Sequence, residues 1–193
     1  MIPIPIDKST TNASWTHRSY FKRFNLNVEQ YGEILVAQAF GGVKKGDAQP
    51  CYDVETSDQE VRARLLASGA SLEKVDSSLS AIQDKMVRIE VKSKLARTPS
   101  GVATVIHCSK NKTEGTRKHP PATHFAVILF DGDGQAEHAW FFATDVAKLL
   151  QQGKSRYIPV SSLKKPAPIG KHDVIDVCSL INGIASSVLS DSA

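Results

Sequence analysis

The chain has 193 residues, a hydrophobic content of 41% and a formal net charge of +4. This length and apolar content are enough to bury a core in one domain, so folding needs neither a disulfide framework nor a structural zinc ion. No segment is long and apolar enough for a signal peptide or a membrane span, and the three cysteines lack Cys-x-x-Cys spacing. We therefore expect a cytoplasmic protein with reduced thiols and no membrane contact. The modest positive charge is compatible with a polyanionic partner but falls short of a dedicated nucleic-acid coat.

We expect residues 1–193 to form a single domain with three parts. An N-terminal arm covers residues 1–25 and mixes basic with aromatic side chains, which either bind nucleic acid or pack onto the domain. The core covers residues 27–150. A C-terminal extension covers residues 154–193.

The first predicted helix covers residues 27–40. Asn27 and Gln30 form a capping-box pattern, and the two glycines at 41–42 provide a natural stop. The helix is apolar nearly all round, which indicates that it is mostly buried. Glu33 lies inside this apolar run, so its carboxylate needs a partner cation, a metal ion or an exit to solvent.

A short strand over 50–54, which contains Asp53, precedes two predicted helices. A second capping-box pattern begins a helix over 59–68. Apolar residues at helical spacing predict another helix between 71 and 84. We interpret these two helices, about residues 57–84, as an insertion.

The stretch Met86–Lys94 predicts a strand with two chemically opposite faces. Since side chains alternate along a strand, its valine and isoleucine residues point into a core. The other face carries the charged side chains, which are Arg88, Glu90, Lys92 and Lys94. Taken alone, this face is typical of a solvated surface on which the acid neutralises its basic neighbours.

The rest of the core is predicted from apolar runs. Residues 102–108 are rich in β-formers and follow a turn, so we expect them to pair antiparallel with the strand over 86–94. Residues 124–130 are almost wholly apolar, as expected of a strand covered on both faces, and 136–143 are its expected neighbour. The remaining expected elements are a helix at 144–152, an edge strand at 156–160 and a terminal helix at 173–189.

Three short motifs follow one another on the first helix, the strand with Asp53 and the strand with Glu90: GEILVAQAFGG, YDV and RIEVKSK. Over residues 27–150 the sequence resembles the PD-(D/E)XK nucleases, the restriction-endonuclease-like proteins. The resemblance implies an α/β fold in which a mixed central sheet is flanked by helices and carries a helical insertion. It also implies Mg²⁺-dependent hydrolysis of phosphodiester bonds, with Mn²⁺ as a substitute.

The resemblance also implies roles for individual residues. Asp53 and Glu90 carry over as metal ligands, and the preference of Mg²⁺ for oxygen ligands makes the main-chain carbonyl of Val91 a further candidate. Lys92 carries over as the catalytic lysine. Glu33 carries over as the acid that some members place on the first helix.

Two features depart from the family pattern. A Cys-Tyr dipeptide stands where a proline is expected before the first acid, and the two metal acids are far apart in the chain. If the helices at 59–83 are not an insertion, Asp84 or Asp58 is the partner of Glu90 instead.

The chemistry of these residue types agrees with the implied roles. Mg²⁺ prefers oxygen ligands and keeps several waters, so two carboxylates and a carbonyl leave room for a substrate phosphate. Lys92 can orient the attacking water, neutralise charge that develops on the phosphorus or, with a lowered pKa, act as a base. Further cations must hold the DNA backbone, and we select Lys94, Lys110, Lys112, Arg117 and Lys118.

These observations predict a Mg²⁺-dependent endonuclease that cleaves double-stranded DNA, in the simplest case a type II restriction enzyme that acts as a homodimer. The alternative is a nuclease fold that has lost catalysis and binds nucleic acid or a protein partner. A histidine-based hydrolase is disfavoured because the sequence has neither H-E-x-x-H nor C-x-x-C spacing. A serine nucleophile elbow and a P-loop are also absent from the sequence.

Overall fold

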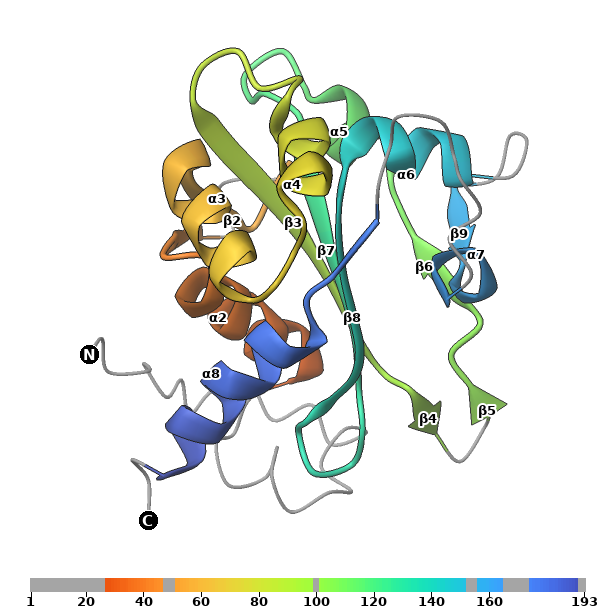
Figure 1. The fold of residues 1–193 in the computed structure, drawn as a ribbon. Coiled ribbons are helices and arrows are strands. Elements are labelled where there is room, and N and C mark those ends of the chain that lie inside the picture. Colours follow the sequence, from red (N-terminus) through yellow and green to blue (C-terminus); the bar gives the residue numbers. More distant parts are fainter. Residues whose placement is uncertain (1–26, 47–50, 99–100, 152–155, 165–173, 191–193) are drawn as a thin grey trace.

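The computed structural model describes residues 27–46, 51–98, 101–151, 156–164 and 174–190. Its centre is a six-stranded sheet with the order β1-β2-β3-β7-β8-β10 (Figure 1). These strands are β1 (Val43–Lys44), β2 (Val54–Ser57), β3 (Met86–Leu95), β7 (His124–Phe130), β8 (Ala136–Ala143) and β10 (Ile175–Asp176). β3 and β7 run parallel, and the other neighbours run antiparallel. The predicted α/β fold with a mixed central sheet is therefore confirmed.

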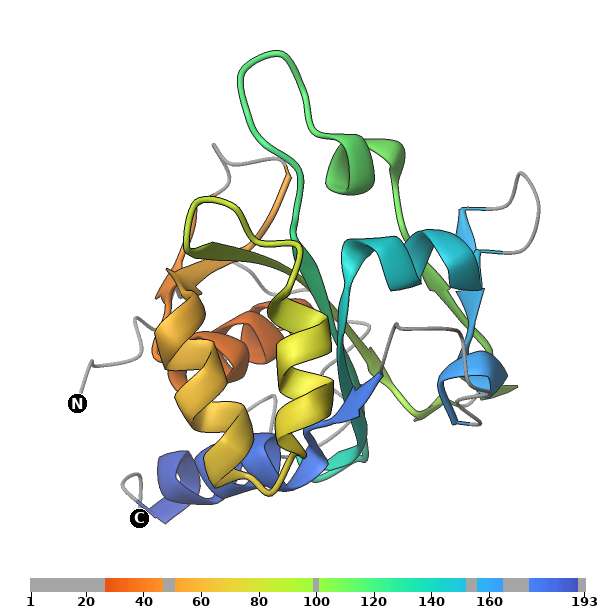
Figure 2. The same ribbon diagram turned by 45° about the horizontal axis from the view of Figure 1, so that its top comes forward.

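Four helices cover one face of the sheet (Figure 1, Figure 2). They are α2 (Val28–Ala39), α3 (Asp58–Ala67), α4 (Leu72–Leu79) and α8 (Cys178–Ser190). The apolar side chains of β3, which are Val87, Ile89 and Val91, are buried against this layer, as their alternation predicts. Asn27 caps α2 in the predicted capping box, because its side chain accepts a hydrogen bond from the Gln30 N–H.

The opposite face of the sheet carries a second core. It is covered by α6 (Thr144–Leu150), α7 (Val160–Lys164) and a ribbon of β6 (Val105–His107) and β9 (Tyr157–Pro159). Phe125, Val127 and Leu129 of β7 belong to this second core, whereas Ala126 and Ile128 belong to the first. The prediction that this strand is covered on both faces is confirmed.

The expected hairpin between residues 86–94 and 102–108 is wrong. β2 and β7 occupy the two edges of β3, so the segment that follows β3 cannot pair with it. The chain instead forms a small hairpin of β4 (Arg97–Thr98) and β5 (Gly101–Val102) and then pairs β6 with β9. The β-rich composition predicts the strand correctly, but its partner depends on a distant segment that takes the edge of β3.

The two helices between β2 and β3 lie where the sequence predicts the insertion. Ser57 caps α3, because its side chain accepts a hydrogen bond from the Glu60 N–H. α4 is shorter than expected and ends at Leu79. The terminal helix begins later than expected, at Cys178, because residues 175–176 form β10 at the edge of the sheet.

The thiols Cys51, Cys108 and Cys178 are free, as their spacing predicts. Among the described residues, no helix has the length and apolar character needed to cross a lipid bilayer. The predicted arm at 1–25 lies outside the described residues.

α2 approaches β3 very closely at Gly32. A Cβ atom at this position would lie 1.8 Å from the Oγ and 2.8 Å from the Cβ of Ser93. Only glycine therefore lets the helix that carries Glu33 pack this closely on the strand that carries Glu90.

We expect Gly32→Ala to lower the free energy of unfolding by about 1–3 kcal/mol, because α2 or Ser93 must shift to make room for the methyl group. Urea unfolding measures the change. Gly183→Ala in α8 is the matched control, because apart from its chain neighbours and the nearby backbone of its own helix no described atom lies within 4 Å of the added Cβ. There the better helix propensity of alanine should stabilise the protein by about 0.5–1 kcal/mol. Unchanged stability of Gly32→Ala would contradict the close approach.

His124 joins the insertion to the sheet. Its Nε2 lies 3.0 Å from the Ser78 carbonyl oxygen of α4, and its Nδ1 lies 3.0 Å from the Thr123 Oγ1. The ring stacks on Phe141 at a centroid distance of 4.8 Å. These partners are uncharged and the ring is 1% exposed, so burial lowers the pKa of His124 to about 4.

The buried histidine predicts a loss of stability in acid. An unfolded histidine binds a proton near pH 6.5 and the folded one only near pH 4, so the unfolded state holds more protons between these values. The free energy of unfolding should fall by up to about 3 kcal/mol through this group as the pH drops from 6.5 to 4. His124→Phe keeps the stacking but does not titrate, so the gap in unfolding free energy between wild type and variant should narrow in acid. A gap that is independent of pH would contradict the prediction.

Candidate active site

Asp53 stands immediately before β2 and extends that strand's pairing with β3. Its N–H donates to the Ile89 carbonyl at 2.9 Å, and its Oδ2 accepts a hydrogen bond from the Val91 N–H at 2.8 Å. The Asp53 carboxylate thus accepts a backbone hydrogen bond from β3 just before the regular β2–β3 pairing begins at Val54. Since the N–H and C=O of one residue point to the same side of an extended strand, the Val91 carbonyl faces the Asp53 side as well.

A small apolar cluster holds the Asp53 segment in place. It consists of Cys51, Tyr52 and Ala122, all of which are buried. The Cys51 Sγ also lies 3.8 Å from the His119 carbonyl oxygen. The cluster connects the residues before β2 with the residues before β7, which are far apart in sequence. The Cys51-Tyr52 dipeptide therefore has a packing role.

Glu90 is the most buried acidic group of the site. Its register partner is Phe125, and the side chain is 0% exposed on the face of the sheet opposite α2. The Lys92 Nζ lies 2.5 Å from its Oε1, and the Lys112 Nζ lies 2.6 Å from its Oε2. Among the described residues, neither oxygen has a hydrogen bond of good geometry. The carboxylate is thus held by two close ion pairs, one to each oxygen.

Lys112 lies between the two carboxylates that the sequence analysis selects. It belongs to α5 (Lys110–Glu114), and its Nζ is 3.9 Å from the Asp53 Oδ1 as well as close to Glu90. Its side chain is 18% exposed. Asp53, Glu90, Lys92 and Lys112 therefore form one cluster, which we call the acid–lysine cluster.

Burial and charge shift the pKa values within the acid–lysine cluster. Burial raises the pKa of Glu90 to about 7, and the charge of Asp53 adds to this rise against the opposing ammonium groups. Burial acts to lower the pKa of Lys92, but the adjacent Glu90 carboxylate outweighs it and the pKa is raised. In this environment Lys92 is held as an ammonium ion, which favours a role in charge stabilisation over a role as a base.

Glu33 lies near the acid–lysine cluster but is not part of it. Its Oε2 forms an ion pair with the Lys44 Nζ of β1 at 3.0 Å. Burial raises the pKa of Glu33, Lys44 opposes the rise and the charge of Asp53 adds to it. The buried acid therefore has a partner cation, one of the three solutions that the sequence leaves open.

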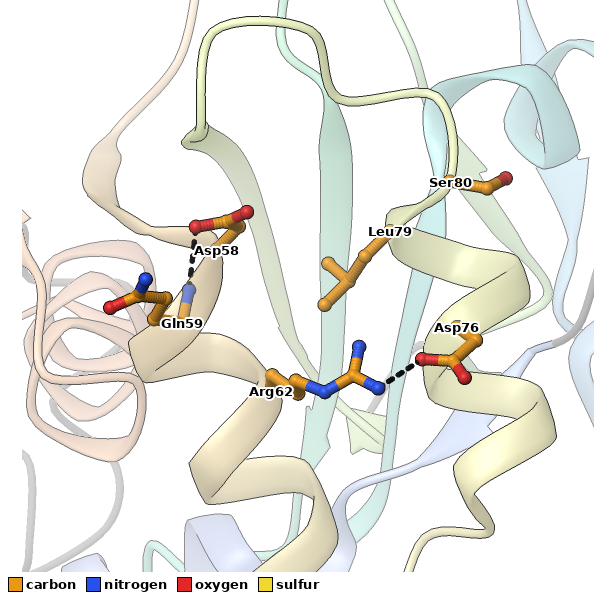
Figure 3. A pocket seen from close by; sticks show the side chains of 6 residues that line it. All are labelled: Asp58, Gln59, Arg62, Asp76, Leu79 and Ser80. Atoms are coloured by element: carbon orange, nitrogen blue, oxygen red, sulfur yellow. Dashed lines mark hydrogen bonds and ion pairs between the residues drawn. The ribbon is translucent and has the colours of Figure 1, made fainter.

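The two acids that could replace Asp53 lie elsewhere. Asp84 forms an ion pair with Arg88. Asp58 begins α3 and lines a cavity of about 200 Å³ between α3 and α4 (Figure 3). The other residues that line this cavity are Gln59, Arg62, Asp76, Leu79 and Ser80. Of the three candidates, Asp53 is the acid that shares a cation with Glu90.

The basic residues selected as DNA contacts have different environments. The Lys94 Nζ donates to the Val105 carbonyl at 3.1 Å, and Lys110 forms an ion pair with Glu114 at 3.3 Å. Arg117 and Lys118 are exposed in the loop between α5 and β7. Lys112 alone of this group reaches the acid–lysine cluster, and its short-range partners are carboxylates.

Cys108 is a neighbour of the cluster that the sequence analysis does not select. The thiol is 1% exposed, and burial raises its pKa to about 12 while the Lys92 cation opposes the rise. The side chain of Gln151 forms a hydrogen bond with this thiol. The alternation of Ile106, His107 and Cys108 along a strand already indicates that the cysteine is on the buried face.

The donor set of the cluster fits a hard divalent cation. Among the described residues no group of three or more His, Cys, Asp or Glu side chains has the geometry of a metal site. Two carboxylates are nevertheless enough for Mg²⁺, which keeps several waters and prefers oxygen ligands. The burial of the Glu90 carboxylate and the cation already placed between the two acids support this fit.

Comparison with known proteins adds no assignment, because no protein-family model matches the chain and no curated protein shows a significant match.

The structural role of Asp53 can be tested separately from any catalytic role. Asp53→Ala removes the acceptor for the Val91 N–H and should lower the free energy of unfolding by about 1.5–3 kcal/mol, the range for hydrogen bonds to charged groups. Asp53→Asn keeps an acceptor oxygen, so its free energy of unfolding should fall clearly less than that of Asp53→Ala. Denaturant unfolding at pH 7.5 measures both variants. Equal losses would show that the hydrogen bond to Val91 does not position this strand end.

Proposed function

We propose that the protein is a Mg²⁺-dependent endonuclease of the PD-(D/E)XK type that hydrolyses phosphodiester bonds in double-stranded DNA. The observation that carries the proposal is the convergence of Asp53 and Glu90 around one cation, with Lys92 in contact with Glu90. Asp53 is far from Glu90 and Lys92 in the chain, and these three residues are the ones that the motif order selects. Chance would rarely bring all of them into one cluster, in which Lys112 links Asp53 to Glu90 and Lys92 contacts Glu90.

Asp53 and Glu90 would hold the ion, together with the Val91 carbonyl. When bound, Mg²⁺ supplies Lewis-acid polarisation of a phosphate oxygen and lowers the pKa of a bound water. The protein contributes a rigid pair of acids, because Asp53 is fixed by the Val91 N–H and Glu90 is fixed by its burial in β3. Rigid ligands keep the reacting groups in place during the reaction.

Lys92 would act as the ammonium group that stabilises negative charge during the reaction. Its raised pKa keeps the ammonium form at neutral pH, and its side chain lies on the same strand face as Glu90. An ammonium group there can orient the attacking water and neutralise the negative charge that develops on the phosphate oxygens. Arg117 and Lys118, exposed in the loop after α5, would bind the DNA backbone without reading its sequence, and Lys94 and Lys110 would assist.

A type II restriction enzyme is the narrower form of this proposal. The chain has room for one catalytic core with one helical insertion, so cleavage of both strands would need two copies. A homodimer with two-fold symmetry would match a symmetric DNA site. The cytoplasm, where DNA is accessible, is the compartment that this role implies.

A binding module without catalysis is the second candidate, and one observation favours it. Two ammonium groups already neutralise Glu90, so the acid–lysine cluster is charge-balanced without a metal ion. A nuclease fold that uses the cluster only as a structural element would bind nucleic acid or a protein partner with the same affinity whether or not a chelator removes divalent ions.

Lys92→Ala decides between the two functions. If Lys92 stabilises the transition state, the variant should lose at least about 100-fold in Mg²⁺-dependent cleavage of supercoiled plasmid, as when one charge-stabilising donor is removed. Its DNA affinity in Ca²⁺, measured by a gel-shift assay, should stay within a few-fold of the wild type. Lys74→Ala, an exposed residue of α4, is the matched control and should cut normally.

Undiminished cutting by Lys92→Ala would contradict the assignment of the catalytic lysine. Wild-type protein that binds DNA but cuts no supercoiled, linear, single-stranded or methylated substrate with Mg²⁺ or Mn²⁺ would favour the binding module.

A further inference from the structure

Lys112 occupies the place that a divalent ion would need. Its Nζ is 2.6 Å from the Glu90 Oε2 and 3.9 Å from the Asp53 Oδ1, so it is the cation that the two acids share. A Mg²⁺ ion bound to both acids would need metal–oxygen distances of about 2.0–2.1 Å. The ion and this ammonium group cannot both have the same oxygens as close neighbours.

Charge balance also favours the departure of one cation. When both acids are ionised, Asp53 and Glu90 carry two negative charges and Lys92 and Lys112 carry two positive charges, so the cluster is neutral. A divalent ion added to this neutral cluster would leave two excess positive charges in a largely buried site. If Lys112 departs, one excess positive charge remains, and a single phosphodiester of the substrate neutralises it.

The local structure allows the side chain to move while its backbone stays. The Lys112 carbonyl accepts a hydrogen bond from the Ala122 N–H at 2.9 Å, and Ala122 belongs to the apolar cluster with Cys51 and Tyr52. Gly115 ends α5 with φ +76° and packs so tightly that a Cβ would lie 2.8 Å from the His119 carbonyl oxygen. The four-carbon stem of a lysine is flexible, and its charged end can move out to solvent.

We propose that Lys112 is a built-in counter-cation that neutralises Asp53 and Glu90 in the metal-free protein and is displaced when a divalent ion binds. This inference rests on the proposed metal-dependent function. The displaced ammonium lies on the segment that continues into Arg117 and Lys118, so metal binding adds a third cation to that basic loop. Occupation of the metal site and affinity for the DNA backbone are thereby coupled.

The first test is the affinity for Mn²⁺, measured by isothermal titration calorimetry without DNA. Lys112→Met removes the competing charge but keeps an unbranched chain of similar length, and it should bind Mn²⁺ at least tenfold more tightly than the wild type. Lys110→Met is the matched control, because Lys110 is on the same helix but pairs with Glu114 in solvent. Asp53→Asn and Glu90→Gln identify the site, since each should abolish the binding.

The second test uses the wild-type protein and does not depend on the folding of a variant. Acetylation of individual lysines is followed by mass spectrometry with and without saturating Mn²⁺. Lys112 should react at least threefold faster with the ion, while Lys110 and Lys118, which are exposed in both states, should not change.

The outcomes separate this inference from the function on which it rests. Mn²⁺ binding that depends on Asp53 and Glu90, without tighter binding in Lys112→Met and without faster labelling of Lys112, overturns the displacement and leaves the nuclease proposal intact. Failure of both wild type and Lys112→Met to bind Mn²⁺ through these acids overturns the metal site and the displacement together.

Discussion

The burial of the Glu90 carboxylate is the constraint on which the site depends. A charged group with 0% exposure is strongly unfavourable unless it is paired, and here two ammonium groups provide the pairing. One of them is Lys92, which lies two residues after Glu90 in β3 and therefore on the same face of the strand. The other comes from α5. Its position requires that the segment after β6 returns to the start of β2, next to Asp53. The topology around β3 therefore places Lys112 next to Glu90 and Lys92.

The parallel pairing of β3 with β7 makes this return possible. Parallel neighbours need a long crossover, and the crossover here contains β4, β5, β6 and α5. It passes over the face of the sheet that carries Glu90 and Lys92, and its last residues pack with Cys51 and Tyr52 beside Asp53. The cation and the two acids are thus contributed by three segments whose contacts are all non-local.

Local signals account for the parts that the sequence predicts correctly. The capping box at Asn27, the alternation in β3 and the continuous apolar run of β7 are each contained in about ten neighbouring residues. The partner of β6 and the position of Lys112 depend on which distant segment occupies the edge of β3, and no local pattern contains that information. A lysine in a polar loop looks the same in sequence whether it contacts solvent or a buried acid, so the sequence groups Lys112 with the neighbouring candidates for DNA binding.

The acid–lysine cluster contains more charged groups than stability requires. A single ammonium group is enough to neutralise Glu90, and a buried ion pair contributes little net stability compared with an apolar replacement of the same volume. The cluster instead holds four charged groups, two of which come from outside β3, and it leaves the Glu90 oxygens without hydrogen bonds of good geometry. Packing alone would favour an apolar side chain at this buried position. An arrangement of buried charges that is costly to fold is expected at a functional site rather than at a purely structural one.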